Sequence, residues 1–551
     1  MTRGALSLRV AALALLTACA AAPGGAGDGP APTGSALEDR IVLTAFDVIP
    51  AVAASQHMVY IATADGIAAL DRDFGRWSAP VALASGFPGG PVTAIAVDPV
   101  EEGVWVAIAG AVLYYRPSLG DLSRGSAPGL VDAIIFDQRD PSAGAYLHGT
   151  SGWSLASRTG MVVPVDPSRV PPPNARILPS TLAEVYDTYP SLRGAGGLLT
   201  QDADLQSWPV IGGSVSPDRS EVWLGTNGGG LFRVDPLFLK GEQLPFGLLQ
   251  TATGALARDA AGVWMAGLGG GGAERTGLTF TSGDLQQWRW IRSPSVTRAM
   301  AGARVFDMSV SGTQMWVGTD RGVVLADAGK ADRTLTWSAT NGLPDDRVLS
   351  VAAAHDGAWV GTARGLAFVA SPGSAAAARA SNVRVAAGTG VAVRALSLAG
   401  DTLWVGSDAG LALLRTSSPD SLPRRVAVDD PRLSRPIRAL ALSDSLVAVA
   451  TENDLIVVDQ RSVAHVPRFD AVNISVVAPV NAMAMDAGTI WLAGNRGVLS
   501  VSRSSGVARL LAAPGVVPAE ALDLVLDRAF AWIATPAGVV RLRRSNDGGV
   551  R

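Results

Sequence analysis

The sequence predicts an all-β fold, a β-propeller built from tandem four-stranded blades. A short motif recurs along almost the whole chain, and each copy has the pattern of a strand, a tight turn and a second strand. The copies are separated by roughly 43 residues, which is enough for four strands of five or six residues and their turns. The copies carry no 3.6-residue periodicity, and this excludes helical repeats of similar length.

Each copy of the motif begins with an apolar residue, an aromatic residue and another apolar residue, followed by Gly or Ala and often Thr. The turn ends in Gly, as at Gly322 and Gly365, where a hairpin needs a positive φ angle. The small residue two positions after the aromatic one, for example Gly318, leaves room for a side chain of the neighbouring blade. We therefore expect the aromatic residues to be structural and to pack between blades. They are Tyr60, Trp105, Trp223, Trp264, Trp316, Trp359, Trp404, Trp491 and Trp532.

The spacing of the copies predicts the number of blades. Tyr146 opens one further copy, Ala448 takes the aromatic position in another, and a degenerate copy is expected around Tyr186. The aromatic positions are 37 to 52 residues apart, which gives about 11 or 12 four-stranded blades. Because one propeller usually has about four to eight blades, we expect two packed propellers, with one large ring as the alternative.

The longest interval between copies predicts the boundary between the two propellers. This interval separates Trp264 from Trp316. The first set of blades is therefore expected at 37–295 and the second set at 296–545.

The two ends of the repeat region predict how a blade is completed. The last copy stops after its third strand, at 538–542, and a spare strand at 40–46 precedes the first blade. We expect the N-terminal strand to complete the last blade, because that pairing hides two sheet edges. One ring would then contain strands from both ends of the chain.

The first residues have the features of an export signal. Arg3 and Arg9 supply positive charge, and Val10 to Leu16 form an apolar stretch too short to span a bilayer. The following Leu16-Thr17-Ala18-Cys19 resembles the bacterial lipobox. The resemblance implies a lipoprotein signal peptide at 1–18 and lipid modification of Cys19, the single cysteine of the chain. An ordinary signal peptide cleaved nearby is the alternative.

The residues after Cys19 predict where the lipid would hold the protein. Ala20 stands where an aspartate would favour retention at the inner membrane, so we expect the outer membrane, facing the periplasm, with exposure at the cell surface as the alternative. Residues 19–36 are rich in Gly, Pro and Ala and predict a flexible tether after the lipidated Cys. Membrane contact is therefore expected through the N-terminal lipid.

One copy of the motif carries a family resemblance. Asn341-Gly-Leu-Pro-Asp-Asp-Arg-Val348, followed by Gly357-Ala-Trp-Val-Gly-Thr362 and Gly365, resembles the two-component-regulator propeller repeat. That family implies sensor regions in the periplasm joined to a membrane helix and a histidine kinase. No kinase-like segment follows the last blade, so we expect a sensor-like propeller without a kinase.

The sequence offers few groups for catalysis or for metal binding. The four histidines form no HExxH or other short-range pair, and GxSxG and SxxK motifs are absent. The run Gly269–Gly272 lacks the Lys and Ser or Thr of a phosphate-binding loop. We therefore expect no catalytic residue, no cofactor, no metal and no enzyme activity. The net charge of −3 argues against nucleic-acid binding.

These observations lead to one main functional hypothesis and two alternatives. The main hypothesis is a cell-envelope lipoprotein whose propeller is a non-enzymatic binding or scaffold module for another envelope protein or for a small ligand or glycan. The first alternative is a sensor or ligand-recognition module that works with a separate membrane kinase or transporter. The second is a propeller hydrolase or lyase, which requires carboxylates or histidines converging at a ring mouth.

Overall fold

The computed structural model describes residues 39–544, except 83–84, 128, 180, 270–275, 329–333, 373–382, 387–389, 418–422 and 427–429. The predicted signal peptide, the tether and Cys19 lie outside the described residues. Within them the chain forms eleven antiparallel sheets of three to five strands, which confirms the all-β prediction and its propeller-like blades. None of the helices in this part of the chain has the length and hydropathy needed to cross a membrane.

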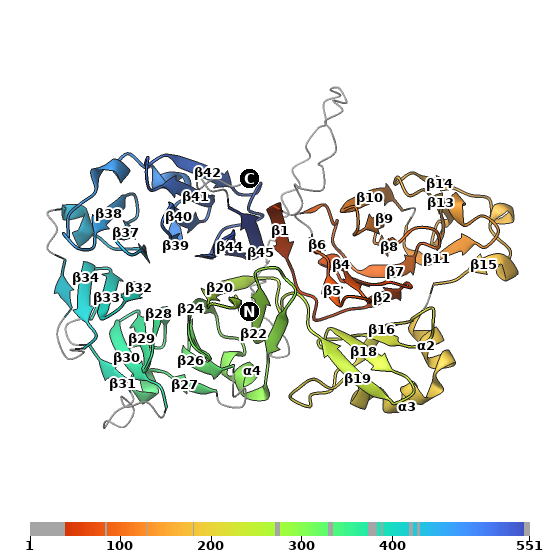
Figure 1. Cartoon of the computed structure of the whole chain (residues 1–551), viewed down its shortest axis with the longest axis horizontal. Helices are drawn as coiled ribbons and strands as arrows, with labels where there is room; N and C mark the ends of the chain where they lie inside the picture. Colours follow the sequence, from red (N-terminus) through yellow and green to blue (C-terminus); the bar gives the residue numbers. More distant parts are fainter. Residues whose placement is uncertain are drawn as a thin grey trace, which may run out of the picture.

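The first group of sheets is formed by residues 51–244 and fills the right half of Figure 1. Its strands are β2 (Ala51–Ala54), β3 (Met58–Ala62), β4 (Gly66–Asp71), β5 (Arg76–Trp77), β6 (Val81–Ala82), β7 (Val92–Val97), β8 (Val104–Ile108), β9 (Ala111–Arg116), β10 (Asp121–Ser126), β11 (Val131–Asp137), β12 (Ala145–Gly149), β13 (Gly152–Ala156), β14 (Val162–Pro164), β15 (Arg176–Ile177), β16 (Val210–Val215), β17 (Val222–Thr226), β18 (Leu231–Asp235) and β19 (Lys240–Leu244). Its helices are α2 (Leu182–Thr188) and α3 (Pro190–Leu199). The inner strands of its four sheets are β2, β7, β11 and β16. β2 contacts both β7 and β16, and β7 contacts β11.

The predicted blade around Tyr186 is wrong, because this segment folds into α2 and α3. The hydroxyl of Thr181 accepts a hydrogen bond from the amide of Glu184 and caps α2, and Pro190 begins α3. α2 contacts β16, and α3 contacts β19. A helical pair therefore lies beside β16, where the repeat spacing had predicted four strands.

The second group of sheets contains β1 (Arg40–Leu43) and the chain from residue 253 to residue 543. Its other strands are β20 (Thr253–Arg258), β21 (Gly262–Gly267), β22 (Leu278–Ser282), β23 (Trp288–Ile291), β24 (Val305–Ser311), β25 (Gln314–Thr319), β26 (Gly322–Asp327), β27 (Leu335–Trp337), β28 (Val348–Ala354), β29 (Gly357–Thr362), β30 (Gly365–Ala370), β31 (Val383–Val385), β32 (Val393–Ala399), β33 (Thr402–Ser407), β34 (Gly410–Arg415), β35 (Arg424–Arg425), β36 (Ala439–Leu442), β37 (Leu446–Ala450), β38 (Leu455–Asp459), β39 (Val480–Met485), β40 (Thr489–Gly494), β41 (Gly497–Ser502), β42 (Ala508–Ala512), β43 (Asp523–Leu526), β44 (Phe530–Thr535) and β45 (Gly538–Arg543). It also contains the helix α4 (Pro294–Met300).

Single-turn 3-10 helices interrupt the loops of both groups. They are η2 (Pro141–Ala143), η3 (Pro167–Arg169), η4 (Pro173–Ala175), η6 (Ala339–Asn341), η7 (Pro431–Ser434), η8 (Pro467–Phe469) and η9 (Ile474–Val476).

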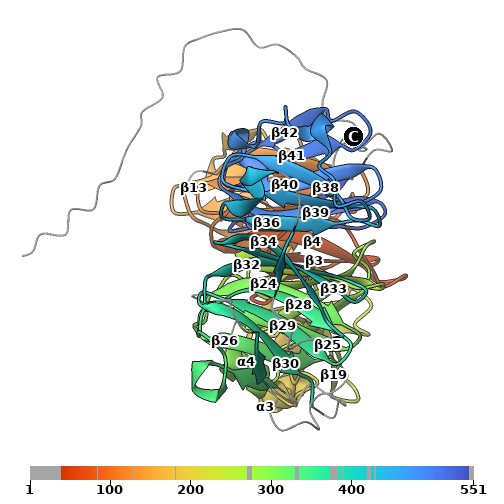
Figure 2. The same ribbon diagram turned by 90° about the vertical axis from the view of Figure 1, so that its left-hand side faces the viewer.

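The inner strands of the second group contact one another in chain order. β20 contacts β24, and the contacts continue through β28, β32, β36, β39 and β43, which in turn contacts β20. The sheet β20–β23 thus packs against β24 and β43, although it precedes the boundary predicted at 295/296. Figure 1 shows the blades of this group arranged around a common centre, and Figure 2 shows the same group from the side.

The predicted pairing of the N-terminal strand with the last blade is confirmed. β1 lies antiparallel to β45 at the edge of the sheet β1-β45-β44-β43, with Val42 opposite Val540. The whole first group therefore lies in the chain between β1 and β20. Both connecting segments pass between the groups side by side, and the amide of Phe46 donates to the carbonyl of Leu248.

An aromatic cluster fills the contact between the two groups. Phe246, on the connector, stacks on Trp77 with ring centres 4.1 Å apart and meets Phe46 and Trp288 edge-on at 5.1 and 5.2 Å. The guanidinium of Arg292 lies 3.7 Å from the ring centre of Trp208 and donates to the carbonyl of Gly228. Aromatic and cation–π contacts thus join the groups directly, in addition to the two connectors.

The Thr of the repeat motif stabilises the hairpin that follows it. The hydroxyl of Thr362 donates to the carbonyl of Gly365 at 2.9 Å and accepts from the amide of Arg364 at 3.2 Å. The same donation to the residue three positions later is made by Thr63, Thr319, Ser407, Thr451 and Thr535. A single hydroxyl thereby satisfies two backbone groups of a tight turn.

The small residue two positions after Trp has the role expected from the sequence. A Cβ atom at Gly318 would lie 2.7 Å from Cγ1 of Val348, and one at Gly406 would lie 2.7 Å from Cγ2 of Ile437. Val348 and Ile437 belong to the neighbouring blades. Glycine at this position therefore lets adjacent sheets approach closely.

Replacing Val42 by Asp tests how strongly the second group depends on β1. Val42 is fully buried in the sheet with β45, so the variant must bury a charge or give up the pairing. We expect the free energy of unfolding to fall by about 3 kcal/mol and the melting temperature to fall with it. Thermal denaturation followed by circular dichroism measures the effect. Val163→Asp, on the partly exposed outer strand β14, is the matched control, and an equal fall in both variants would contradict the dependence.

Candidate functional site

The inner strands carry β-bulges near their first residues. In β7, β11, β16, β20, β24, β28, β32 and β39 the register with the next strand shifts by one residue, so one residue of each is unpaired. A bulge re-aims the side chain of its unpaired residue. The unpaired residues are Thr93, Asp132, Ile211, Gly254, Phe306, Leu349, Arg394 and Asn481.

All eight bulged residues line one of two cavities at the centres of the two groups. Thr93, Asp132 and Ile211 line a cavity of about 540 Å³ in the first group. The other five line a cavity of about 340 Å³ in the second group. Arg438 and Leu522, which precede Ala439 and Asp523 of β36 and β43, line this second cavity as well. Each of the seven sheets thus contributes one side chain or glycine at the equivalent position.

Four arginines give the second cavity a positive lining. Arg394 and Arg438 occupy the bulge position or its equivalent, and Arg304 and Arg347 directly precede β24 and β28. They come from four consecutive sheets, and we call them the arginine arc. The rest of the lining includes Phe306, Leu349, Asn481, Leu522, Leu268, Pro479, Val305, Val480 and Gly254.

Contacts hold the arginine arc in place, and only one of its four arginines is paired with a carboxylate among the described residues. The guanidinium groups of Arg304 and Arg347 lie 5.5 and 5.2 Å from the ring centre of Phe306, which both contact. Arg394 forms a bidentate pair with Asp408, with distances of 2.6 and 3.1 Å. Within the described residues, the guanidinium groups of Arg304, Arg347 and Arg438 have no carboxylate partner.

Two carboxylates near the arginine arc are engaged with the backbone. Asp320 accepts from the amide of Arg304 at 2.9 Å, and Asp345 accepts from the amide of Arg347 at 2.9 Å. Asp345 also pairs with Arg364, which is outside the cavity lining, at 3.3 Å. Fork-shaped guanidinium donors are therefore free to bind an anion at this mouth.

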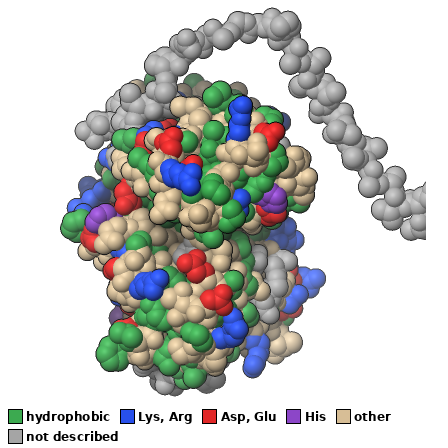
Figure 3. Space-filling view, turned by 90° about the vertical axis from the view of Figure 1, so that its right-hand side faces the viewer, with side chains coloured by type: hydrophobic (Ala, Val, Ile, Leu, Met, Phe, Trp, Pro, Cys, Tyr) green, Lys and Arg blue, Asp and Glu red, His purple; other side chains and the backbone are tan. Residues whose placement is uncertain are grey.

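The cavity of the first group has the opposite charge. Its lining includes Asp132, Glu184 and Asp187 together with apolar residues of β2, β7, β11, β16 and α2. Asp132 is bonded to Nδ1 of His148 at 2.6 Å, and Asp187 lies 3.8 Å from Arg193. Two of its three carboxylates thus have partners, whereas three of the four arginines of the second cavity have no carboxylate partner among the residues described. Figure 3 shows acidic and basic side chains mixed over the outer face of the first group.

Side chains also link the inner strands of neighbouring blades in the second group. Asp307 accepts from the amide of Val351 at 2.7 Å, and Asp523 accepts from the amide of Leu256 at 2.7 Å. Burial, followed by the charge of Asp523, raises the pKa of Asp307 to about 8, and burial raises the pKa of Asp523 to about 6. Near neutral pH the Asp307 carboxyl therefore holds its proton in the folded protein.

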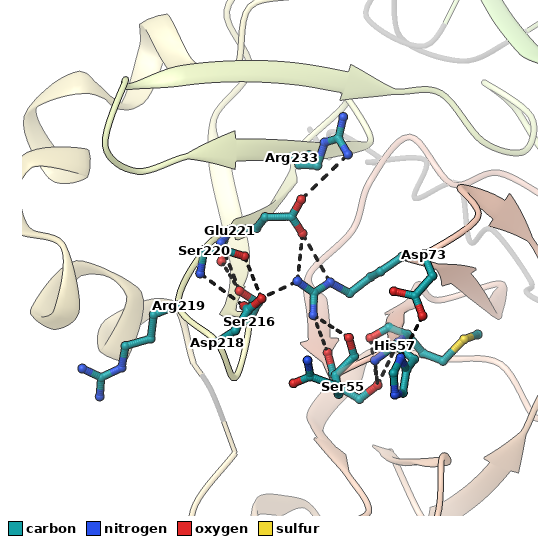
Figure 4. Close-up of polar contacts among 12 residues, drawn as sticks. Ser55, His57, Asp73, Ser216, Asp218, Arg219, Ser220, Glu221 and Arg233 are labelled. Atoms are coloured by element: carbon teal, nitrogen blue, oxygen red, sulfur yellow. Dashed lines mark hydrogen bonds and ion pairs between the residues drawn. The ribbon is translucent and has the colours of Figure 1, made fainter.

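A polar cluster links the first and fourth sheets of the first group. Arg72, on the turn after β4, donates to Glu221 at 3.1 and 3.3 Å and to the carbonyls of Ser55 and Gln56 (Figure 4). Glu221 precedes β17, so this arginine joins the first sheet of the group to the fourth. The side chain of Arg72 therefore links two sheets that are far apart in the sequence.

The same cluster contains serine, histidine and aspartate, but not in a catalytic arrangement. Nδ1 of His57 is bonded to Asp73 at 2.8 Å, and both side chains are more than half exposed (Figure 4). The hydroxyl of Ser55 donates to Glu102 at 2.8 Å and accepts from the amide of Met58. The hydroxyl is therefore engaged with Glu102 and the backbone rather than with the imidazole, so the three groups do not form a proton relay.

The structure places the sequence-predicted residues away from the cavities. The nine aromatic residues of the repeat lie on the second strand of their sheets and are buried, with Tyr60 and Trp316 fully inaccessible. Several Trp indoles donate to a turn aspartate, as Trp264 does to Asp259 at 3.0 Å and Trp532 to Asp527 at 2.7 Å. In the described part of the chain, no group of three or more His, Cys, Asp or Glu side chains could hold a metal ion.

The arginine arc was missed because the repeat was aligned on its Trp strand. The inner strands align as Val393-Arg394-Ala395-Leu396 and Ile437-Arg438-Ala439-Leu440, with Val305-Phe306-Asp307 and Val348-Leu349-Ser350 in the same register. The second residue of each varies in chemistry, the residue before it is always Val or Ile, and the residue after it is Ala, Ser or Asp. That variable position, compared across blades, is the sequence signal that could have found the site.

Comparisons with known proteins support the fold. No protein family profile matches the chain, and no curated protein sequence matches it. Among solved structures, it is similar to PorZ, described as an essential bacterial surface component of the type-IX secretion system of Porphyromonas gingivalis. The TM-score is 0.51 at 13% identity, covering 92% of this chain and 87% of the other.

A second similar structure is the extracellular domain of BT4673 from B. thetaiotaomicron, assigned as a hybrid two-component system. The TM-score is 0.38 at 14% identity, covering 90% of this chain and 63% of the other. At these identities the likeness to PorZ concerns the fold alone.

The raised pKa of Asp307 predicts that stability falls as pH rises. An unfolded aspartate ionises near pH 4, whereas Asp307 keeps its proton in the folded state up to about pH 8. Unfolding between these values releases a proton, so the melting temperature should fall between pH 6 and pH 8. We expect Asp307→Asn to reduce this slope, as measured by differential scanning calorimetry. Asp401→Asn is the control, because hydrogen bonds lower the pKa of that exposed carboxyl and it stays ionised over this interval. A slope that is unchanged in Asp307→Asn would contradict the assignment.

Proposed function

We propose that this protein is a non-enzymatic binding module of the cell envelope, and that its second group of blades binds an anionic ligand at the arginine arc. One observation carries the proposal: four consecutive blades direct arginines to one cavity, and three of the four have no carboxylate partner among the described residues. Unpaired guanidinium groups clustered at one mouth repel one another, and a bound anion relieves that repulsion. A small organic anion, or an anionic group of an envelope protein or glycan, would serve as the ligand.

The proposal includes two packed propellers. The inner strands of the second group contact in a cyclic order, which supports a ring of seven blades made of β1 and β20–β45. The four sheets between residues 51 and 244, with α2 beside β16, would form the smaller propeller. We accordingly place the division at the connectors 44–50 and 245–252, in place of the boundary inferred from spacing at 295/296.

One observation favours a sensor role for the same site. Arg347 belongs to the segment Asn341–Val348, which resembles the two-component-regulator repeat, and it lines the cavity. The segment that resembles a sensor repeat would thus supply a ligand contact. A sensor module acting with a separate membrane kinase or transporter is therefore our second candidate function.

Neutralising the arginine arc tests the proposed function. The double variant Arg347→Gln/Arg438→Gln removes two charged donors but keeps side chains of similar length. We expect citrate, which carries three carboxylates, to bind the wild-type protein and to bind the variant about a hundredfold more weakly. Isothermal titration calorimetry at low salt measures both, and binding to the wild type should weaken as salt is added.

The matched control is Arg461→Gln, an arginine on the turn after β38, outside the cavity lining. Its citrate affinity should equal that of the wild type. The proposal fails if neither citrate nor pyrophosphate binds the wild-type protein saturably at millimolar concentration. It also fails if the double variant and the wild type bind them equally.

A lipid anchor at Cys19 forms part of the proposal and has its own test. The lipobox-like Leu16-Thr17-Ala18-Cys19 supports acylation at this residue. Cys19→Ser should move the protein from the membrane fraction to the soluble fraction of cells and abolish labelling with radioactive palmitate. Immunoblotting of the two fractions is the measurement. Persistent membrane association of Cys19→Ser without label would show that something other than a lipid holds the protein there.

A further inference from the structure

The second cavity is chemically divided into two halves. Arg304, Arg347, Arg394 and Arg438 come from the consecutive sheets that begin with β24, β28, β32 and β36. The described lining residues contributed by the sheets of β39, β43 and β20 are uncharged: Leu268, Pro479, Asn481, Leu522 and Gly254 among them. We call this the neutral half. Cations thus occupy one arc of the mouth, and apolar and amide groups face it.

We infer that the ligand of this cavity is a small amphipathic organic anion with at least two anionic groups. Its anionic groups would contact the arginine arc, and an apolar, preferably aromatic, body would lie against the neutral half and Phe306. This inference rests on the proposed function and specifies the chemistry of its ligand.

The number of free guanidinium groups sets the charge of the ligand. One of the four arginines, Arg394, already donates two hydrogen bonds to Asp408, from Nε and Nη2. Arg304, Arg347 and Arg438 keep their donors free of carboxylates within the described residues. A single carboxylate has only two oxygens and cannot engage three separated forks, whereas two or three anionic groups can.

The neutral half sets the apolar character of the ligand. Leu268 and Leu522 are only half-buried, although both line the cavity. A ligand with an apolar body would remove the exposed surface of these leucines from water, whereas an inorganic anion would leave that surface in contact with water. The ring of Phe306, already in contact with two guanidinium groups, adds an aromatic face to the wall.

The size of the cavity sets an upper limit to the ligand. Its volume of about 340 Å³ lies at the lower end of the range for small-molecule sites. A single substituted aromatic ring fits such a space, whereas a folded protein domain could only cover the mouth. The cavity therefore favours a small molecule over an extended interface.

Two tricarboxylates with the same number of charges test the inference. Benzene-1,3,5-tricarboxylate has a flat aromatic body, and citrate has a short, hydroxylated one. We expect the aromatic anion to bind the full-length protein about tenfold more tightly than citrate by isothermal titration calorimetry, because its ring buries apolar surface. Leu522→Asn and Leu268→Asn should each bring this ratio toward one while leaving citrate affinity within about twofold of wild type. Leu510→Asn, a partly exposed leucine on the outer strand β42, should leave the ratio unchanged.

The outcomes separate this inference from the proposed function. If citrate and pyrophosphate bind in an arginine-dependent manner but the aromatic anion has no advantage, the inference fails and the proposed function stands. If the advantage is present but unchanged in both Leu522→Asn and Leu268→Asn, the neutral half is not what recognises the ring, and the inference also fails. If no anion binds, both fail. Melting temperatures of the variants within a few degrees of wild type exclude loss of folding as the cause.

Discussion

The pairing of β1 with β45 is the constraint on which the rest of the structure depends. Every other sheet of the second group is built from consecutive strands, but this one joins Arg40–Leu43 to Gly538–Arg543. The pairing needs strands from both ends of the described chain. The chain must therefore leave the second group after β1, form the first group, and return to the second group at nearly the same place. The two connectors therefore run side by side, and the aromatic cluster around Phe246 packs where they cross between the groups. A nested chain path, in which the first group lies between β1 and the other strands of the second group, follows from this one edge.

Much of this fold could be predicted from the sequence because its strongest constraints are local and repeated. The Thr hydroxyl that caps a hairpin, the glycine that admits a neighbouring Val and the buried Trp each act within one blade or between adjacent blades. Such constraints require the same residue type at the same position of every blade, so a regular spacing appears in the sequence. The pairing of the chain ends could also be predicted, because an incomplete last blade and a spare first strand are complementary edges.

Other features could not be predicted, because residues that occur in a single copy change the local structure there. Around Tyr186 the spacing favoured a blade, but Thr181 and Pro190 are helix-starting residues, and the chain there forms two helices. The long interval between Trp264 and Trp316 suggested a boundary between domains. The described residues of that interval include α4, which follows β23 and precedes β24. An interval in a repeat measures loop length, and loop length alone does not distinguish an insertion from a domain boundary.

The candidate site escaped prediction for the opposite reason, since it is made where the repeat is free to vary. Trp, Thr and Gly positions are fixed by packing and turn geometry, so they carry no information about a ligand. In the eight bulged inner strands, the β-bulge leaves one residue without a ladder partner, and that residue lines one of the two cavities. The strand ladder does not restrict that residue, so each blade can offer a different group at an equivalent place. This freedom explains how one architecture carries Asp132 at the mouth of the first group and Arg394 at the mouth of the second, and why the chemistry of each mouth can change while its blades remain the same.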